Sequence, residues 1–347
     1  MKKVQLLLLV FFCSFAASQA QDIHFSQFYL SPLNLNPALT GLMNCNKRLV
    51  GNYRSQWASV LRDKAYSTFS ASYDQKIPVG RYDYFGIGGT LWRDKAGSLE
   101  FGSMQARLSF SYSKKMGGYR KKSNYLVIGA DAGVTQRSID FTNAQWGAQN
   151  DNGVFNPALN SLETTFNRDN FVFADMAAGL LWFFVNGDQS NYYIGGAYHH
   201  INRANQSFVQ NNLEPLYSRF TIHGGGEFKT SDRFGLVPGA IVMLQGPSME
   251  INAGTSFKYF LGSNKALQQA VQFGIWGRYA HKLETENHFD AIVLSSRFDY
   301  DQFSIGFSYD VNVSSLTPAS NSNGAFEFSI VYKLCGPEIR KVYCPNF

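Results

Sequence analysis

The stretch Ser103–Tyr112, with the sequence SMQARLSFSY, alternates strictly between polar and apolar side chains. Successive side chains of a β-strand point to opposite faces of the sheet, so this segment presents one polar face and one apolar face. A transmembrane β-barrel requires such strands, because lipid surrounds its outer face while its inner face lines a polar lumen. The alternative is a water-soluble sandwich whose apolar faces point inward.

The same alternation recurs near the C-terminal end, where every second residue of 303–314 and of 326–334 is apolar. Charged residues make up 16% of the chain, below the roughly 25% that is usual in soluble domains. Aromatic residues make up another 16%, and they are enriched in the girdles at both interfaces of a membrane barrel. Pattern and composition together favour the barrel over the sandwich.

Short strand candidates, each bounded by turn residues, follow one another along the chain. We count about fourteen, an even number that brings both ends of the strand region to one side of the membrane. The predicted fold is all-β, a transmembrane antiparallel up-and-down β-barrel over residues 49–335, with a long irregular loop at 138–170. The strand candidates centre near Tyr53, Phe69, Ile87, Leu108, Ile128, Ala178, Ile194, Ile222, Ile241, Ala253, Phe273, Val293, Phe307 and Ile330.

Residues 1–20 have the features of a cleaved export signal peptide. Lys2 and Lys3 form a basic start, an apolar core too short to span a bilayer follows, and small residues precede the cleavage point. We expect the mature chain to begin near Gln21. No later segment has the eighteen or so uninterrupted apolar residues of a membrane helix, so the exported chain is periplasmic, secreted or an outer-membrane barrel. Because the low charged and high aromatic fractions favour the barrel, the predicted location is integral to the outer membrane of a Gram-negative cell.

Two segments outside the strands are expected to have roles of their own. Residues 21–48 contain turn-forming proline and asparagine and form an N-terminal extension, expected on the periplasmic side and folded against the barrel mouth. This extension either seals the mouth as a cap or offers a docking surface for secretion machinery. Residues 336–347 form a C-terminal tail with the same two alternatives.

Three cysteines remain once the signal peptide is removed: Cys45, Cys335 and Cys344. Cys335 and Cys344 are close in sequence in an exported chain, which makes them a candidate disulfide. Cys45 would then be free or paired elsewhere. None of the spacings resembles a zinc site, so no metal is expected.

Several ionisable residues fall on the polar face of the strand candidates and are expected to face the lumen. They pair with one another across the barrel wall, or they line a polar lumen that water, a plug or a peptide fills. Asp310 and Glu327 lie on neighbouring strands and are candidates to share a basic partner such as Lys333 or Arg278. The lumen candidates are Arg107, Asp131, Asp175, Glu227, Glu250, Arg278, Asp310, Glu327 and Lys333.

The remaining chemistry of the chain is sparse. The formal net charge is +6, but the basic residues are dispersed, so we expect no nucleic acid partner. There is no nucleophile elbow and no paired-histidine helix motif, so neither an enzyme activity nor a cofactor is predicted. Outer-membrane lipid is the one partner that the residue pattern itself implies.

An ordered set of short strings runs through nearly the whole mature chain. The set resembles the PorP/SprF family, outer-membrane proteins associated with the type IX secretion system of Bacteroidota. One departure is Phe326, which stands where a histidine is expected before Glu327. The strings that carry the resemblance include Gln27-Phe28-Tyr29, Asn36-Pro37-Ala38, Tyr53-Arg54, Gln56-Trp57, Tyr193-Ile194-Gly195, Trp276-Gly277, Ser308-Tyr309-Asp310 and Tyr343-Cys344-Pro345.

The resemblance implies a barrel that supports secretion or cell-surface attachment of a cognate protein, such as an adhesin with a C-terminal domain, with a link to gliding motility. The implied partners are that secreted protein and periplasmic type IX components. A passive outer-membrane diffusion porin is the alternative function. The candidate partner-binding residues are Gln27, Phe28, Tyr29, Asn36, Pro37, Ala38, Arg54 and Trp57.

Overall fold

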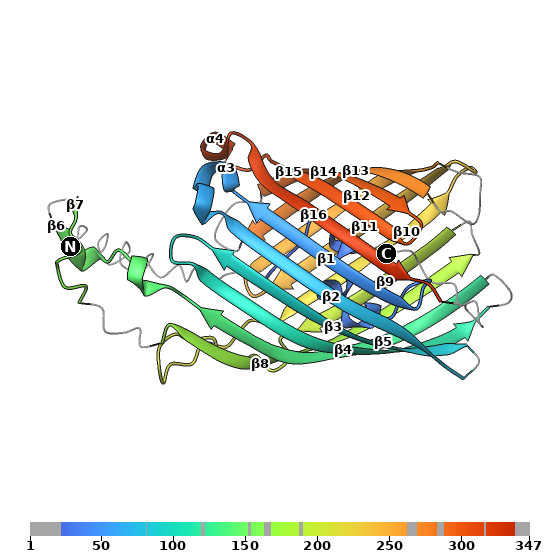
Figure 1. Ribbon diagram of the computed structural model, residues 1–347, viewed down its shortest axis with the longest axis horizontal. Helices are drawn as coiled ribbons and strands as arrows, with labels where there is room; N and C mark the ends of the chain where they lie inside the picture. Colours follow the sequence, from blue (N-terminus) through green and yellow to red (C-terminus); the bar gives the residue numbers. More distant parts are fainter. Residues whose placement is uncertain are drawn as a thin grey trace, which may run out of the picture.

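Fourteen antiparallel strands, counted over the part of the chain that the structure describes, close into one barrel in this computed structural model (Figure 1). Each strand pairs with the barrel strands before and after it along the chain, and the first strand pairs with the last to close the ring. The described residues are 22–80, 82–118, 122–151, 154–162, 168–186, 190–261, 269–282, 288–315 and 317–336.

The predicted all-β up-and-down barrel is confirmed, and each predicted strand centre lies in a different barrel strand. The predicted signal peptide lies outside the described residues. The barrel strands are β1 (Lys47–Gln56), β2 (Tyr66–Val79), β3 (Asp83–Ala96), β4 (Phe101–Gly117), β5 (Lys122–Ser138), β8 (Asn170–Asn186), β9 (Ser190–His199), β10 (Arg219–Lys229), β11 (Phe234–Gln245), β12 (Ser248–Phe260), β13 (Gln269–Lys282), β14 (His288–Tyr300), β15 (Phe303–Asn312) and β16 (Asn323–Leu334).

The two faces of the barrel wall follow the sequence alternation. On β4, Leu108 is 63% exposed and Phe110 is 53% exposed on the outer face, whereas Arg107 and Ser109, which alternate with them, are buried on the inner face. This is the inverse of a soluble protein, whose exposed face is polar. The exposed apolar band is therefore a lipid-facing surface, and the sandwich alternative fails.

The two ends of the barrel differ in their connections. At the end where β1 begins and β16 ends, which we call the terminal end, the strands are joined by two to eight residues. The two longest connections, 139–169 and 200–218, lie at the opposite end, which we call the loop end. The first of these carries the short strands β6 (Asn150–Asp151) and β7 (Val154–Phe155), seen at the far left of Figure 1.

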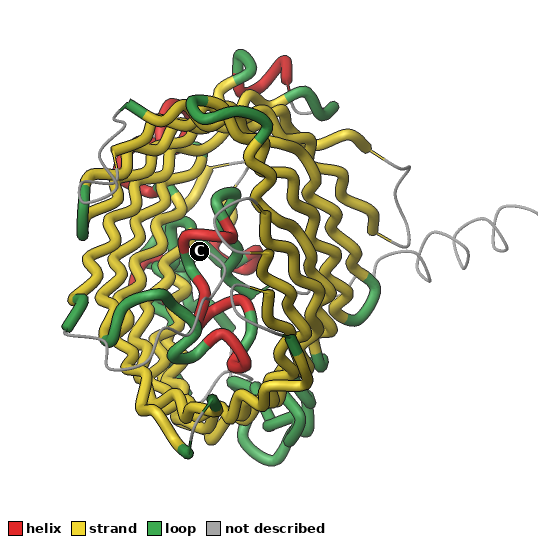
Figure 2. The backbone as a smooth tube through the Cα atoms, turned by 90° about the vertical axis from the view of Figure 1, so that its right-hand side faces the viewer, coloured by secondary structure: helices red, strands yellow, loops and turns green. Residues whose placement is uncertain are grey.

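The N-terminal extension lies inside the barrel. Figure 2, which looks into the terminal end, shows its short helices within the ring of strands. The expectation that this segment folds against the mouth is therefore wrong: residues 22–46, which we call the plug, fill the lumen. The physical reason is that the plug carries apolar residues, among them Leu33, Leu39 and Leu42, and each is at most 1% exposed. Burying them stabilises the plug inside the barrel by about 1.5–3 kcal/mol for each side chain.

Prolines and an asparagine set the local shape of the plug. It contains η1 (Phe28–Leu30), α2 (Pro32–Leu35) and η2 (Pro37–Leu39), and both proline-led turns begin with the proline, whose fixed φ and missing N–H suit the first helical position. Asn36 caps the second of these, because its side chain accepts a hydrogen bond from the Ala38 N–H at 2.8 Å. The sequence Asn-Pro-Ala thus encodes a turn.

The other short helices lie at the loop end. They are α3 (Ala58–Leu61) and η3 (Arg62–Lys64) after β1, η4 (Phe141–Asn143) and η5 (Gly147–Gln149) in the long loop, and α4 (Thr317–Ser320) before β16. None of the helices in the described ranges has the length and apolar character needed to cross a bilayer.

Cys45 and Cys335 form a disulfide, which corrects the predicted pair of Cys335 with Cys344. Cys45 lies just before β1 and Cys335 just after β16, and Lys47 faces Leu334 across the seam between these strands. Barrel closure therefore brings together two cysteines that are 290 residues apart, a contact that closeness in sequence cannot indicate. Cys344 and the tail from 337 onward lie outside the described residues.

Candidate functional site: a lumen filled by the N-terminal segment

The plug crosses the lumen from one end to the other. At the loop end, the Asp22 N–H donates to the side chain of Gln245, the last residue of β11, at 3.1 Å. At the terminal end, the Gly41 N–H donates to Asp74 at 2.7 Å, and Cys45 joins the seam between β1 and β16. The chain therefore enters β1 only after threading the whole barrel.

An ionic latch holds the loop end of the plug. Asp22 pairs with His200, which follows β9, and lies 3.5 Å from Arg219. The other ring nitrogen of His200 lies 2.9 Å from Asp175 on β8. Burial alone lowers the pKa of His200, but the Asp22 and Asp175 carboxylates outweigh it and raise the pKa to about 9. His200 is therefore charged at neutral pH and ties the plug to the wall.

The carboxylate of this latch is stabilised in its charged form. Burial acts to raise the pKa of Asp22, but His200 and Arg219 outweigh that effect and hold the pKa far below its ordinary value. Nearby, burial together with the charges of Arg54 and Arg278 lowers the pKa of His24 well below its usual value. The latch thus depends on one charged histidine, while the histidine beside it stays neutral.

Four buried side chains surround Ser26, and we call them the Ser26 cage: Arg54, Arg278, Asp310 and Glu327. The Ser26 N–H donates to Glu327 at 2.6 Å, and its hydroxyl donates to Asp310 at 2.9 Å. The same hydroxyl accepts from Arg54 at 2.8 Å and from Arg278 at 2.9 Å. Each cage residue is at most 3% exposed, so the cage buries two positive and two negative charges in mutual contact.

The cage is also internally paired. Arg54 bonds both Glu327 and Asp310, the latter at 3.0 Å, and Arg278 bonds Asp310 at 2.8 Å. The prediction that Asp310 and Glu327 share a basic partner is therefore right, but the shared partner is Arg54 rather than Lys333 or Arg278. The Gln27 N–H completes the set by donating to the second oxygen of Glu327 at 3.0 Å.

Aromatic side chains pack the middle of the plug against the wall. The ring of Tyr29 stacks on Trp276 of β13 with centroids 5.3 Å apart, and Phe28 meets the same indole edge-on at 5.8 Å. Trp276 donates its indole N–H to Ser295 at 3.0 Å. These contacts join the plug to the main apolar cluster of the lumen.

Glycines in the wall admit the Asn-Pro-Ala turn. A Cβ atom added to Gly129 on β5 would lie 2.4 Å from the Ala38 nitrogen, and one added to Gly179 on β8 would lie 1.9 Å from the Asn36 side-chain oxygen. Any larger residue would collide with the plug. The amide of Asn36 also donates to the backbone oxygens of Leu180 and Gly196 at 3.2 and 3.1 Å. The turn and the wall are therefore matched surfaces.

A second buried ion pair fixes the terminal end of the plug. Arg48 on β1 bonds both oxygens of Asp74 on β2, at 3.0 and 2.8 Å. Arg48 also donates to the backbone oxygens of Leu39 and Leu42, at 3.1 and 3.4 Å. Since Asp74 also accepts from the plug backbone, this pair clamps the plug beside the disulfide.

The structure gathers most of the predicted partner-binding residues in the lumen. Gln27, Phe28, Asn36, Pro37, Ala38 and Arg54 are buried there, and Tyr29 is partly buried. Trp57 lies apart, after the last residue of β1 at the loop end, where it is also partly exposed. All of these residues except Trp57 therefore take part in contacts between the plug and the wall.

The predicted lumen residues do line the inner wall, and both interpretations of them hold in part. Some pair across the wall, as Arg107 does with Asp131 at 3.4 Å and Glu227 does with Lys258 at 2.9 Å. Others hold the plug: Asp175 acts through His200, and the cage acts through Ser26. Glu250 lies 3.9 Å from the neutral ring of His24. Lys333 forms no ion pair with a carboxylate of the described residues.

Sequence reasoning missed several groups that hold the plug. Arg48 and Asp74 occupy alternate positions that β1 and β2 turn inward, so the strand period could have found them. No sequence signal indicates Asp22, His200 or Arg219, because their meeting depends on where the plug ends. Within the described ranges, no group of three or more His, Cys, Asp or Glu side chains is placed to hold a metal ion.

Comparison with known proteins points to one family. A family model described as "Type IX secretion system membrane protein PorP/SprF" matches residues 17–332. Among curated proteins, none matches the chain.

The chain is also similar to several solved structures, at low sequence identity. The chain is similar to the CymD monoaromatic hydrocarbon channel, with 12% identity, a TM-score of 0.47, and 89% of this chain and 94% of that chain covered. It is also similar to a FadL homologue from Pseudomonas aeruginosa, with 13% identity, a TM-score of 0.41, and coverage of 86% and 92%. CdiB from Escherichia coli matches with 6% identity, a TM-score of 0.46, and coverage of 82% and 62%.

Proposed function

Because this chain belongs to the PorP/SprF family of type IX secretion system membrane proteins, we propose that it supports the secretion or surface attachment of a cognate protein. That protein carries a C-terminal domain, as a secreted adhesin would, and a role in gliding motility belongs to the same proposal. The barrel sits in the outer membrane with its terminal end toward the periplasm. Short turns on that side and longer loops outside are the usual arrangement of such barrels.

The plug is the observation that carries this proposal. A passive porin needs a continuous aqueous path, whereas the lumen here holds a segment fixed by the Ser26 cage, the His200 latch and a disulfide. The cost of removing one partner from a buried ion pair is about 3–5 kcal/mol. A barrel closed in this way acts through the surfaces at its two mouths, and so it serves as a scaffold for partners.

Trp57 and the loops near it form the outer candidate surface. Trp57 precedes α3, whose Val60 and Leu61 are exposed at the loop end, and α3 contacts α4. Exposed apolar side chains beside the mouth suit a secreted partner that has just reached the cell surface. The buried candidates, in contrast, reach a partner only if the plug leaves the lumen.

Co-purification tests the proposed function. The tagged protein is extracted from native outer membranes in mild detergent, and bound proteins are identified by mass spectrometry, with an unrelated tagged barrel from the same membranes as the control. Recovery of a large surface protein through its C-terminal domain, or of periplasmic type IX components, is expected. A partner-free barrel that conducts ions in planar bilayers would contradict the proposal and favour the porin.

A further inference from the structure

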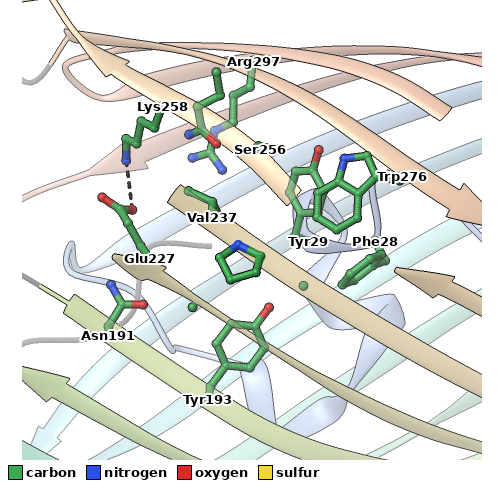
Figure 3. A pocket seen from close by; sticks show the side chains of 14 residues that line it. Phe28, Tyr29, Asn191, Tyr193, Glu227, Val237, Ser256, Lys258, Trp276 and Arg297 are labelled. Atoms are coloured by element: carbon green, nitrogen blue, oxygen red, sulfur yellow. Dashed lines mark hydrogen bonds and ion pairs between the residues drawn. The ribbon is translucent and has the colours of Figure 1, made fainter. Parts of the chain in front are cut away.

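A small pocket lies between the plug and the wall in the lumen (Figure 3). Two cations line it, and both are already paired. Lys258 pairs with Glu227 at 2.9 Å, the dashed contact in Figure 3, and Arg297 pairs with Asp299 at 2.7 Å. A site with free charged donors is found instead on the outer surface of the barrel.

The outer face of β3 runs from one membrane interface to the other. It begins with Asp83, continues with the exposed apolar side chains of Phe85, Ile87 and Leu91, and then reaches the exposed Arg93. Arg93 is ten positions after Asp83, which is about 33 Å along a strand and about 25 Å along the axis of a barrel whose strands tilt by about 40°. The apolar band of such a barrel is also about 25 Å tall. Arg93 therefore lies at the loop-end boundary of the band, at the level of the lipid headgroups.

Arg93 has no acidic neighbour on the strands beside it. The residues that face it in the register are Phe69 on β2 and Met104 on β4, and both are exposed and apolar. Arg93 forms no ion pair with any side chain that the structure describes. A guanidinium carries five donors in a planar fork that fits the oxygens of a phosphate. A phosphate group at the headgroup level would therefore satisfy Arg93.

A basic turn lies next to Arg93. The turn η3, with the sequence Arg62-Asp63-Lys64, is net positive, and its arginine and lysine are exposed. It leads directly into β2, whose first residues pair with the end of β3 at Lys95. Lys95 itself is paired with Glu100 at 2.7 Å. Positive charge from two neighbouring strands is thus gathered at the loop-end interface.

We propose that Arg93, together with the η3 turn, binds the phosphate group of a lipid in the outer leaflet. The acyl chains of this lipid lie along Phe69, Met104 and the apolar outer face of β3. A free phosphate ion would contact only the cations and would gain nothing from these apolar side chains. The choice of leaflet rests on the orientation given in the proposed function, whereas the binding of a phosphorylated lipid does not.

Native mass spectrometry of the purified full-length barrel in detergent tests this site. The probe is lipid A, a phosphorylated glycolipid, and the comparison ligands are the same lipid after removal of its phosphate and inorganic phosphate alone. The phosphorylated lipid is expected to bind about tenfold more tightly than the dephosphorylated lipid, because only the former makes a hydrogen bond between charged groups. Inorganic phosphate at the same concentration is expected not to displace it.

Arg93→Gln removes the free guanidinium and is expected to weaken the binding of lipid A about tenfold. Arg93→Lys keeps the charge but loses the planar fork, so a smaller loss is expected. The matched control is Lys47→Gln, which removes an exposed cation from the outer face at the terminal end and should leave binding unchanged. Heat-modifiable migration on gels confirms that each variant is a folded barrel.

Equal binding of the two lipids, an unchanged affinity in Arg93→Gln, or an equal loss in Lys47→Gln would overturn the lipid site. Displacement of lipid A by the same concentration of inorganic phosphate would show a simple anion site and would also overturn it. If type IX partners co-purify while lipid A does not bind, the lipid site is rejected and the proposed function stands. If lipid A binds while no type IX partner is recovered, the site stands and the proposed function is rejected.

Discussion

The two halves of the plug are held by different balances of ionic, apolar and covalent contacts. Toward the loop end, Asp22 and Ser26 are bound by charged side chains that lie on the barrel wall and in its loops. Toward the terminal end, Pro37 and Leu39 are bound by apolar burial and a close fit to glycines, and Cys45 is joined covalently to Cys335. The buried Arg48–Asp74 pair adds an ionic contact to this end. Ionic contacts respond to pH and salt, whereas apolar fit and a disulfide respond little. The plug is thus anchored at the terminal end, whereas its hold at the loop end depends on pH and salt.

Gly129→Val gives the largest expected effect, because it disturbs the close fit between the wall and the terminal-end half of the plug. Its Cβ would lie 2.4 Å from the Ala38 nitrogen, which costs about 3 kcal/mol or more unless the plug moves. We expect the plug to leave its seat and the barrel to conduct ions in planar bilayers. Gly89→Val, at an outer position with ordinary contacts beyond 3.4 Å, is the control and should stay closed. A closed Gly129→Val barrel would show that the fit to the turn does not hold the plug.

Arg54→Ala removes one of the charged side chains that hold the loop-end half of the plug. It leaves Asp310 and Glu327 buried without their shared partner, which destabilises the loop-end half of the plug by about 3–5 kcal/mol. Faster hydrogen exchange at Ser26 and Gln27, with unchanged exchange at Leu39, is the expected pattern. Lys114→Ala removes an exposed ion pair with Asp83 and should leave both halves as they were. Uniform acceleration along the plug would mean that its two halves are not independent.

Replacing Cys45 and Cys335 with serine removes the covalent anchor. Loss of a structural disulfide costs about 2–4 kcal/mol in the chain-entropy account. The ten paired positions of β1 and β16 remain, so we expect a closed barrel with a lower thermal midpoint by heat-modifiable migration. Reduction of the wild-type protein should produce the same shift. Ion conductance in the serine variant would show that the disulfide, rather than the fit, keeps the plug in place.

A rise in pH gives the smallest expected effect. The pKa of His200 is about 9 in the folded barrel and about 6.5 when unfolded, so its contribution is complete below pH 6.5 and is lost as the pH rises through 9. The loss is at most about 3 kcal/mol. Exchange at Asp22 should quicken between pH 7 and 10 while exchange at Leu39, corrected for intrinsic rates, stays constant. In Asp22→Asn the pH dependence of exchange should be smaller than in the wild type. An unchanged pH dependence in this variant would disprove the latch.

The lipid-facing surface of the barrel could be predicted from the sequence. Leu108 and Phe110 face lipid because a strand alternates its side chains with a fixed period of two, and each residue carries that information locally. The inward positions of Asp131 and Asp175 followed from the same period. What they bind did not follow, because Arg107 and His200 reach them from other strands and loops.

The sequence alone determined the number of strands, their lipid-facing residues and the proline-led turns of the plug, since these depend on periodicity and on fixed backbone angles. Only the tertiary structure decided that the plug lies in the lumen, that Arg54 bridges Asp310 and Glu327, and that Cys45 pairs with Cys335. Each of these contacts joins residues far apart in the chain. Closure of the ring decides which residues meet, and a local sequence pattern contains no information about that closure.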